Sequence, residues 1–473
     1  MKTSLTLAFV FIFSIHSLAQ NWQDTTKLIG EIFSRYQPGH PGCQLAISRH
    51  GKIIYSRAWG LSDLEHSTPL STSSIIEAGS VSKQFTAAAI LLLQSAGKLS
   101  LNDDVRKYLP ELPDYGKIIT LKDMIHHTSG LKDWGSLMAF SDWPRGTKIY
   151  SNEDVLRIII RQKSLNHNPG EEFLYSNTNY VLLAIIVQRV SGQSLAEFTS
   201  LKIFRPLQMN STQWRNDIRR VVPGRAIAYS KEGDLYFTDM PYENVYGNGG
   251  LLTTAEDLLK WNDYYTHANL DGPGFLKEQL DTIPLNNGQP NNYAAGLRLV
   301  NIKGFNAIVH DGATAAYRSI LEYYPELDLG IAWLANTSEF DGKDDGLDAL
   351  RSLLLGEKTP AKENKVAVIS KGKSSGSEMP AKNIVLNKEA LQVYEGNYRS
   401  SEVESSLEIV LTGTTIKIKR IKGDIFTLQP VSDQEFKIEN SRIKVVFEKN
   451  ADGKVLQLKF SSPKVRNVCF EKT

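Results

Sequence analysis

The sequence reads Glu77-Ala78-Gly79-Ser80-Val81-Ser82-Lys83-Gln84-Phe85-Thr86 and continues as Ala87-Ala88-Ala89-Ile90-Leu91-Leu92-Leu93-Gln94. Ala, Leu and Gln favour helix, so we expect a helix from about Ser80 to Ser95, with Gly97 as its C-terminal stop. Lys83 would follow Ser80 by one turn on the same face, which brings an amine near a hydroxyl. The apolar remainder predicts a buried central helix whose N-terminal N–H groups can hold an oxyanion.

The Ser-x-x-Lys pattern is not specific by itself. It recurs at Ser95, Ser129, Ser370, Ser441 and Ser461. A serine helix cap with a lysine reaching to the surface is the alternative interpretation of such a pair. A serine becomes a nucleophile only beside a base, so the other motifs of the chain decide between the two.

A second motif is Tyr175-Ser176-Asn177, which precedes an apolar helical run beginning at Tyr180. Tyr175 would act as a base or a proton shuttle, and Asn177 would supply an amide that binds substrate. Tyr-x-Asn also occurs at Tyr150, Tyr242 and Tyr246. The copy at Tyr150 is better explained as a helix cap. A packed tyrosine bonded to backbone is the alternative for Tyr175.

A third motif, His310-Asp311-Gly312-Ala313, ends a strand-like run. The glycine lets a ligand approach the strand backbone closely. His310 would contact the substrate or the tyrosine, whereas a structural histidine is the alternative.

Taken together, these three motifs resemble those of the serine β-lactamase-related, penicillin-binding-protein-like hydrolases of the class C, D-aminopeptidase and esterase type. The similarity covers roughly residues 25–355, and residues 387–473 resemble the lipocalin-like barrel of some of these relatives. The resemblance to the hydrolases also extends to the segments His126-His127-Thr128-Ser129-Gly130-Leu131, Tyr175-Ser176-Asn177-Thr178-Asn179-Tyr180, Pro206-Leu207-Gln208-Met209 and Gly249-Gly250-Leu251.

The resemblance implies an α+β fold, in which an antiparallel sheet is flanked by helices beside a helical subdomain, followed by a small all-β barrel. It implies Ser80 as the acylated nucleophile, with Lys83 and Tyr175 sharing the proton transfers. Which of these two is the general base stays open. The implied oxyanion hole is made by the backbone N–H groups of Ser80 and Ala313.

The resemblance also implies that Asn177, His310 and Gly312 bind substrate. Here the chain departs from the β-lactamases, which carry Lys-Thr/Ser-Gly where this chain has His310-Asp311-Gly312. A histidine is mostly neutral at pH 7, so the fixed cation that would meet a substrate carboxylate is missing. We therefore expect neutral esters or amides to be preferred over β-lactams, and activity on anionic substrates to rise as His310 charges toward about pH 6.

The chain length of 473 residues predicts two or three domains. Residues 1–19 combine Lys2, an apolar run and the small-x-small end Ser17-Leu18-Ala19, which predicts a cleavable signal peptide and a secreted or periplasmic protein. We expect the hydrolase domain at 20–356, a Lys-, Ser-, Gly- and Pro-rich linker at 357–386 and the all-β domain at 387–473. No later stretch predicts a transmembrane segment.

The composition and motifs limit the kinds of partner and cofactor that the sequence predicts. The net charge of +2 gives no argument for nucleic acid, and there is no metal-ligand or cofactor motif. Cys43 and Cys469, the two cysteines, are expected to be free thiols. We expect a small-molecule or peptide substrate, such as a cell-wall-derived peptide, and the sequence leaves the oligomeric state open.

These observations predict a secreted serine hydrolase that acts through an acyl-enzyme on esters or on D-amino-acid peptides and amides. The alternatives are a β-lactamase or D,D-peptidase, and a sensor or binding protein that is acylated but deacylates slowly. A degenerate hydrolase serving as an adhesion module is disfavoured, because all three motifs are intact.

Overall fold

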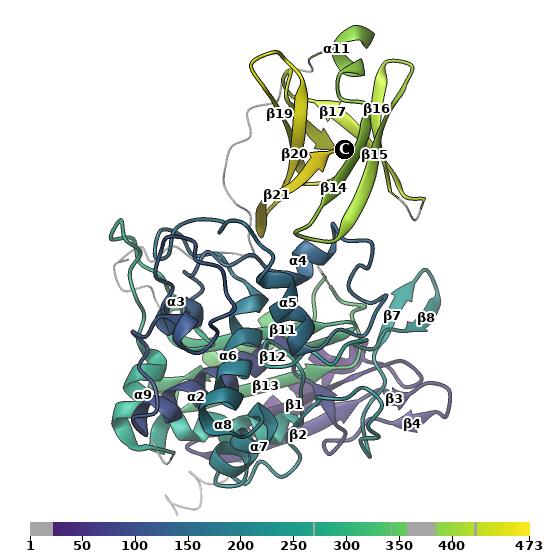
Figure 1. Ribbon diagram of the computed structural model, residues 1–473. Helices are drawn as coiled ribbons and strands as arrows, with labels where there is room; N and C mark the ends of the chain where they lie inside the picture. Colours follow the sequence, from purple (N-terminus) through teal and green to yellow (C-terminus); the bar gives the residue numbers. More distant parts are fainter. Residues whose placement is uncertain (1–21, 268–269, 342, 357–383, 385, 421–422) are drawn as a thin grey trace, which may run out of the picture.

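The computed structural model describes residues 22–267, 270–341, 343–356, 384, 386–420 and 423–473. The chain forms a sheet covered by helices, which we call the N-terminal part (residues 22–356), and a barrel (residues 388–472), as Figure 1 shows. This confirms the predicted α+β fold followed by an all-β barrel. The predicted signal peptide and nearly all of the predicted linker lie outside the described residues.

The central sheet of the N-terminal part has six antiparallel strands in the order β10-β11-β12-β13-β1-β2. β1 and β13 are short runs that are buried along nearly their whole length, as expected for interior strands, and the turn at His50-Gly51 explains the first hairpin. The strands span Arg298–Ile302 (β10), Phe305–Thr314 (β11), Tyr317–Tyr324 (β12), Leu329–Ala335 (β13), Cys43–Arg49 (β1) and Lys52–Trp59 (β2).

The sheet combines strands from both ends of the N-terminal part. β2 forms one edge, and β13 pairs with β1 from Cys43↔Ala335 to Arg49↔Leu329 and is interior. The four later strands form a meander, and its last strand meets β1, so β10 is left at the other edge.

The predicted central helix begins slightly later than expected. Gly79–Ser82 forms a 3-10 turn (η2), and the α-helix α2 spans Lys83–Ser95. Residues 83–91 of α2 are all buried, as predicted for a core helix. A second buried helix, α6, spans Asn177–Ser191 and ends at Gly192, whose φ of 73° is the left-handed conformation that favours glycine at a helix end.

The remaining elements of the N-terminal part surround these two helices, with α8 packed on the sheet (Figure 1). Residues 22–32 are also helical. The other helices are α3 (Leu121–Ile125), α4 (Trp134–Met138), α5 (Asn152–Ile159), α7 (Leu195–Thr199), α8 (Ala255–His267), α9 (Gly272–Leu280) and α10 (Leu347–Leu355). The short strands are β3 (Leu61–Asp63), β4 (Thr68–Pro69), β5 (Ile76–Glu77), β6 (Gln213–Trp214), β7 (Tyr229–Glu232), β8 (Leu235–Thr238) and β9 (Leu251–Thr253).

The barrel follows a short helix, α11 (Lys388–Gln392), and closes eight strands in chain order. Its inward-facing side chains are buried against one another, including an aromatic group of Tyr394, Phe436 and Phe447, so the interior is packed with side chains. The lipocalin-like relationship stays a prediction. The strands are β14 (Gly396–Ser400), β15 (Ser405–Thr412), β16 (Thr415–Arg420), β17 (Ile425–Pro430), β18 (Glu435–Ile438), β19 (Lys444–Lys449), β20 (Val455–Ser462) and β21 (Val465–Lys472).

The barrel sits on the side of the N-terminal part where α4 and α5 lie (Figure 1). Phe140 stacks on Phe460 across this contact with ring centroids 5.2 Å apart. Glu402, on the connection between β14 and β15, is buried opposite Lys132, with 3.8 Å between carboxylate oxygen and Nζ. An apolar stack and a buried ion pair therefore fix the barrel to the N-terminal part.

Both cysteines are free thiols, as expected; Cys43 is buried and Cys469 is partly exposed. Within the described residues, no single helix has the length and apolar composition to cross a membrane. The α6 helix and the helical segment Leu195–Phe204 pass that test only as a pair bent by 78°.

Candidate active site

The structure brings together Ser80 and Lys83 as the sequence predicted. Ser80 lies in η2 with its side chain partly exposed, and Lys83 opens α2 with its side chain buried. The Lys83 Nζ lies 3.1 Å from Ser80 Oγ. Ser95, which begins another Ser-x-x-Lys match, is exposed at the far end of the same helix.

The other partners of Lys83 are pure acceptors. Its Nζ donates to Asn177 Oδ1 at 2.9 Å and to the backbone oxygen of Asn248 at 2.5 Å. A neutral amine has two N–H bonds and one lone pair, and these two oxygens take both N–H bonds. The lone pair is then left for the proton of Ser80 Oγ, which is the arrangement that a base beside a nucleophile needs.

Electrostatics favour this neutral form. Burial lowers the pKa of Lys83 well below its ordinary value, and the positive charge of Lys464 in the barrel lowers it further. Asp133 and Asp311 oppose the shift, and Arg145 adds to it. The amine of Lys83 is therefore easier to deprotonate than that of an exposed lysine.

Tyr175 lies beside this pair. Burial raises its pKa above the ordinary value, and a hydrogen bond with Ser80 acts in the opposite direction. Lys83 Nζ lies 4.9 Å from the centroid of the Tyr175 ring. The phenol is therefore protonated at neutral pH and suits a proton donor or relay better than a base.

The local sequence explains how Asn177 is placed. It is the first residue of α6, and its backbone N–H donates to Asp133 Oδ2 at 2.8 Å. The side chain of the next residue, Thr178, donates to the Lys132 oxygen and accepts from Trp134 N. These contacts fix the N-terminus of α6 so that the Asn177 amide oxygen faces Lys83. In contrast, Ser151 after Tyr150 caps α5 in a capping box, as predicted.

His310 is buried, with 1% of its surface exposed. Its Nδ1 donates to the Asp311 oxygen at 2.6 Å, so Nε2 accepts from the Tyr293 hydroxyl at 3.0 Å. Burial lowers the pKa of His310 well below its ordinary value; Asp311 opposes the shift, and Arg298 and Lys83 reinforce it. The expectation that His310 becomes charged near pH 6 is therefore wrong, and its contact with substrate stays a prediction.

Two glycines bring the expected oxyanion-hole donors close together. A Cβ at Gly79, where φ is +48°, would lie 2.7 Å from Ala313 N, and one at Gly312 would lie 2.9 Å from Ser80 N. Only glycine permits this approach of η2 to β11. The backbone N–H groups of Ser80 and Ala313 are thus neighbours, beside a partly exposed hydroxyl and an exposed Ala313.

Sequence reasoning missed three contributors. The glycine-rich loop was noted, but nothing marked the Asn248 carbonyl as a partner of Lys83, because a backbone acceptor has no side-chain signature. His127 packs against Tyr175, Tyr180 and Tyr293, with its Nε2 buried and without a hydrogen-bond partner among the described residues. Lys464, from the barrel, lies 5.2 Å from the Tyr175 ring centroid.

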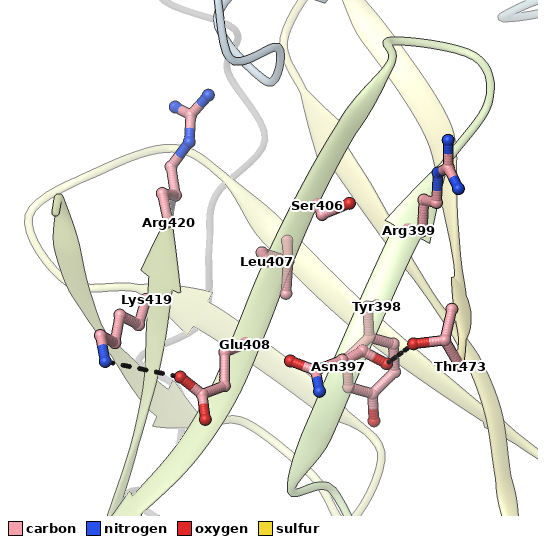
Figure 2. A pocket seen from close by; sticks show the side chains of 9 residues that line it. All are labelled: Asn397, Tyr398, Arg399, Ser406, Leu407, Glu408, Lys419, Arg420 and Thr473. Atoms are coloured by element: carbon pink, nitrogen blue, oxygen red, sulfur yellow. Dashed lines mark hydrogen bonds and ion pairs between the residues drawn. The ribbon is translucent and has the colours of Figure 1, made fainter. Parts of the chain in front are cut away.

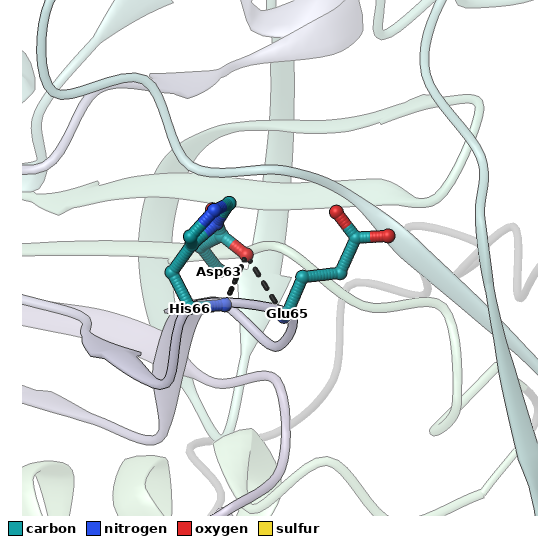
Figure 3. Close-up of side chains that lie close together, drawn as sticks. All are labelled: Asp63, Glu65 and His66. Carbon is teal, nitrogen blue, oxygen red and sulfur yellow. Dashed lines mark hydrogen bonds and ion pairs between the residues drawn. The ribbon is translucent and has the colours of Figure 1, made fainter.

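Two other features lie apart from this site. Asp63, Glu65 and His66 gather at the β3–β4 turn (Figure 3), but the Asp63 carboxylate already accepts from the backbone N–H of the other two and from the His66 ring, so we assign no ligand there. A cavity of about 560 Å³ lies on the barrel (Figure 2). Its lining includes Glu408 and Lys419, which pair with each other.

The N-terminal part is similar to known proteins. The sequence profile described as "Beta-lactamase" matches residues 21–355. Penicillin-binding protein 4* of Bacillus subtilis (strain 168) is 29% identical over 341 residues, which are 67% of this chain and 74% of that protein. The chain spans 74% of the length of that protein, and 60% to 63% of the length of the Protein flp sequences of Staphylococcus aureus, to which it is 28% to 30% identical.

Two solved structures share the fold. The octameric penicillin-binding protein homologue from Pyrococcus abyssi has a TM-score of 0.61 and 22% identity, over 95% of this chain and 99% of that one. The D-amino acid amidase from Ochrobactrum anthropi SV3 has a TM-score of 0.61 and 20% identity, over 70% of this chain and 98% of that one.

Proposed function

Since this chain belongs to the beta-lactamase family, whose members are serine hydrolases that form an acyl-enzyme, we propose that it cleaves esters or D-amino-acid peptides and amides with Ser80 as the nucleophile. The observation that carries the proposal is the contact between Lys83 Nζ and Ser80 Oγ, in which two acceptors occupy the N–H bonds of the amine. The D-amino acid amidase among the structures of the same fold supports the substrate class.

The proposed reaction has two halves. Ser80 Oγ gives its proton to Lys83 and bonds to the substrate carbonyl carbon, while the N–H groups of Ser80 and Ala313 hold the oxyanion. The bond to the leaving group then breaks, and the leaving group takes a proton through Tyr175. In the second half, water gives a proton to the same groups and bonds to the acyl carbon. The bond between this carbon and Ser80 Oγ then breaks, Ser80 Oγ takes up the proton, and the acid product leaves.

Covalent labelling and turnover test this proposal. A fluorophosphonate should add one group per chain at Ser80, detected by mass spectrometry, and a panel of p-nitrophenyl acetate, D-amino-acid p-nitroanilides and nitrocefin should identify the class that is turned over. Ser80→Ala should lose both labelling and turnover. Ser95→Ala removes an exposed serine of the same pattern and should retain both. Full labelling of Ser80→Ala would contradict the assignment.

The same experiment distinguishes the hydrolase from the alternative function, a sensor or binding protein that is acylated but deacylates slowly. A chain that is labelled by its own substrate, but releases less than one further equivalent of product, would be the slowly deacylating binding protein. Sustained turnover would exclude it.

We also propose that the protein is secreted or periplasmic and meets a small-molecule or peptide substrate there. The support is the signal-peptide pattern of residues 1–19. Expression in a bacterial host, followed by N-terminal sequencing of the exported chain, should find Gln20 as the first residue. A chain retained in the cytoplasm with residues 1–19 attached would contradict this.

A further inference from the structure

A lysine from the barrel stands at the candidate active site. Lys464 lies in the two-residue turn between β20 and β21, where Ser462 pairs with Val465. Its Nζ lies 5.2 Å from the centroid of the Tyr175 ring, and Lys83 Nζ lies 4.9 Å from the same centroid. Lys464 is partly exposed, whereas Lys83 is buried. The proposed nucleophile, its base and a cation from the barrel therefore share one neighbourhood.

The turn that carries Lys464 is held firmly against the N-terminal part. The Asn166 side chain donates to the Lys464 oxygen at 3.0 Å and accepts from Arg466 N at 2.8 Å. The Arg466 guanidinium forms two hydrogen bonds with the Glu172 carboxylate, each 2.8 Å long. The backbone of the turn is thus fixed at Lys464 and directly after it, while the Lys464 side chain extends to the Tyr175 ring.

Among the described residues, Lys464 differs from the two arginines near the site, because no carboxylate pairs with it. Arg298 pairs with Asp311 at 3.1 Å, and Arg145 pairs with Glu243 at 2.5 Å. No carboxylate within the described part of the chain lies within ion-pair distance of Lys464 Nζ, whose recorded contact is with the Tyr175 ring. An unpaired ammonium beside a nucleophile is suited to an anionic group of the substrate.

We propose that Lys464 binds the carboxylate of the acyl donor, so that the barrel supplies the fixed cation that the His310-Asp311-Gly312 motif lacks. This inference rests on the proposed function and narrows its substrates to peptides or esters that carry a carboxylate near the scissile bond. Lys464 is thereby a specificity-determining residue, and the bond-breaking steps remain with Ser80, Lys83 and Tyr175.

Binding is measured first, in full-length chains that carry Ser80→Ala and do not turn over. The probes are N-acetyl-D-alanyl-D-lactate, which ends in a carboxylate, and the corresponding D-lactamide, which ends in a neutral amide and is otherwise identical. By calorimetry the carboxylate should bind about 10- to 100-fold more tightly, the gain typical of a hydrogen bond between charged groups. Adding Lys464→Met should abolish most of that preference, and adding Lys464→Arg should keep most of it.

The matched control is Lys454→Met, which removes the same charge at the opposite end of β20 and should leave the preference unchanged. Equal binding of the two probes, or an unchanged preference in Lys464→Met, would overturn the inference. These binding results do not depend on turnover. Failure of the proposed function would instead appear as absent labelling and hydrolysis in the wild type.

With Ser80 intact, Lys464→Met should lower kcat/KM for the D-lactate ester relative to the D-lactamide ester by about 10- to 100-fold. A merely structural lysine would lower both values together, and that result would also overturn the inference. Rescue of the ratio by Lys464→Arg would support it.

Discussion

Replacing Glu402 by glutamine should lower the free energy of unfolding by several kcal/mol. Its carboxylate is 2% exposed, lies 3.8 Å from the Nζ of a fully buried Lys132, and accepts from Lys163 N and Cys469 N at 3.0 Å each. Removing one partner of a buried ion pair costs about 3–5 kcal/mol. Since Lys132 Nζ makes no hydrogen bond among the described residues, we take about 3 kcal/mol for the lost charge.

The amide adds a second cost. Glutamine has one accepting oxygen, so one of the two backbone N–H groups that now bond to Glu402 would face an NH₂ group. An unsatisfied buried donor costs about 1–3 kcal/mol, so we expect Glu402→Gln to lower the free energy of unfolding by about 4 kcal/mol. Lys132→Met should cost only about 1–2 kcal/mol, because Glu402 keeps both backbone donors.

Urea unfolding followed by tryptophan fluorescence measures these values, because all seven tryptophans precede residue 357. In the double variant no buried ammonium is stranded, so its loss should be smaller than the sum of the single losses by at least about 1 kcal/mol. A cost below about 1 kcal/mol for Glu402→Gln, or an equal cost for Lys132→Met, would refute the reasoning.

Other outcomes follow from the site. Ser80→Ala should cost about 10³-fold or more in kcat/KM and retain the wild-type circular dichroism spectrum; a folded variant with near-normal activity would contradict its role. Tyr175→Phe should cost nearly as much and Tyr150→Phe little; the reverse order in the same assay would mean that the wrong tyrosine was chosen. Because Lys83 must lose its proton, kcat/KM should rise with pH through its lowered pKa and then level off, and Lys464→Met, which removes a positive charge, should shift this rise to higher pH; a profile that falls over this range would contradict the assignment. Trypsin should cut within 357–386, and a segment resistant to it would not be a linker.

The parts of the site that are local in sequence were predictable. Ser80 and Lys83 are three residues apart at a helix start, so helix geometry alone brings them together. Asn177 begins a recognisable buried helix, and its placement beside Lys83 follows once α2 and α6 are both core helices. The antiparallel sheet was expected from the family resemblance, and the position of β13 depended on pairing that no local pattern encodes.

The features that were not predicted depend on contacts between segments that are distant in sequence. Lys464 follows Lys83 by hundreds of residues, and a lysine in a hairpin turn ordinarily signals only a solvated surface. Glu402 and Lys132 are also typical surface residue types, and only the docking of the barrel buries them. His310 was expected to titrate, because its burial beneath Tyr293 cannot be read from the motif itself.

The two-residue turn between β20 and β21 places the proposed determinant of substrate preference in a different part of the chain from the residues that form the acyl-enzyme. The acylating groups belong to η2, α2 and α6, where almost any change disturbs a packed core. Position 464 sits at a hairpin tip whose neighbours hold it by backbone hydrogen bonds to Asn166, so its side chain can change without altering those bonds. Descendants of such a chain would therefore acquire new substrate preferences by single substitutions in the barrel, while the inherited chemistry of the N-terminal part stays untouched.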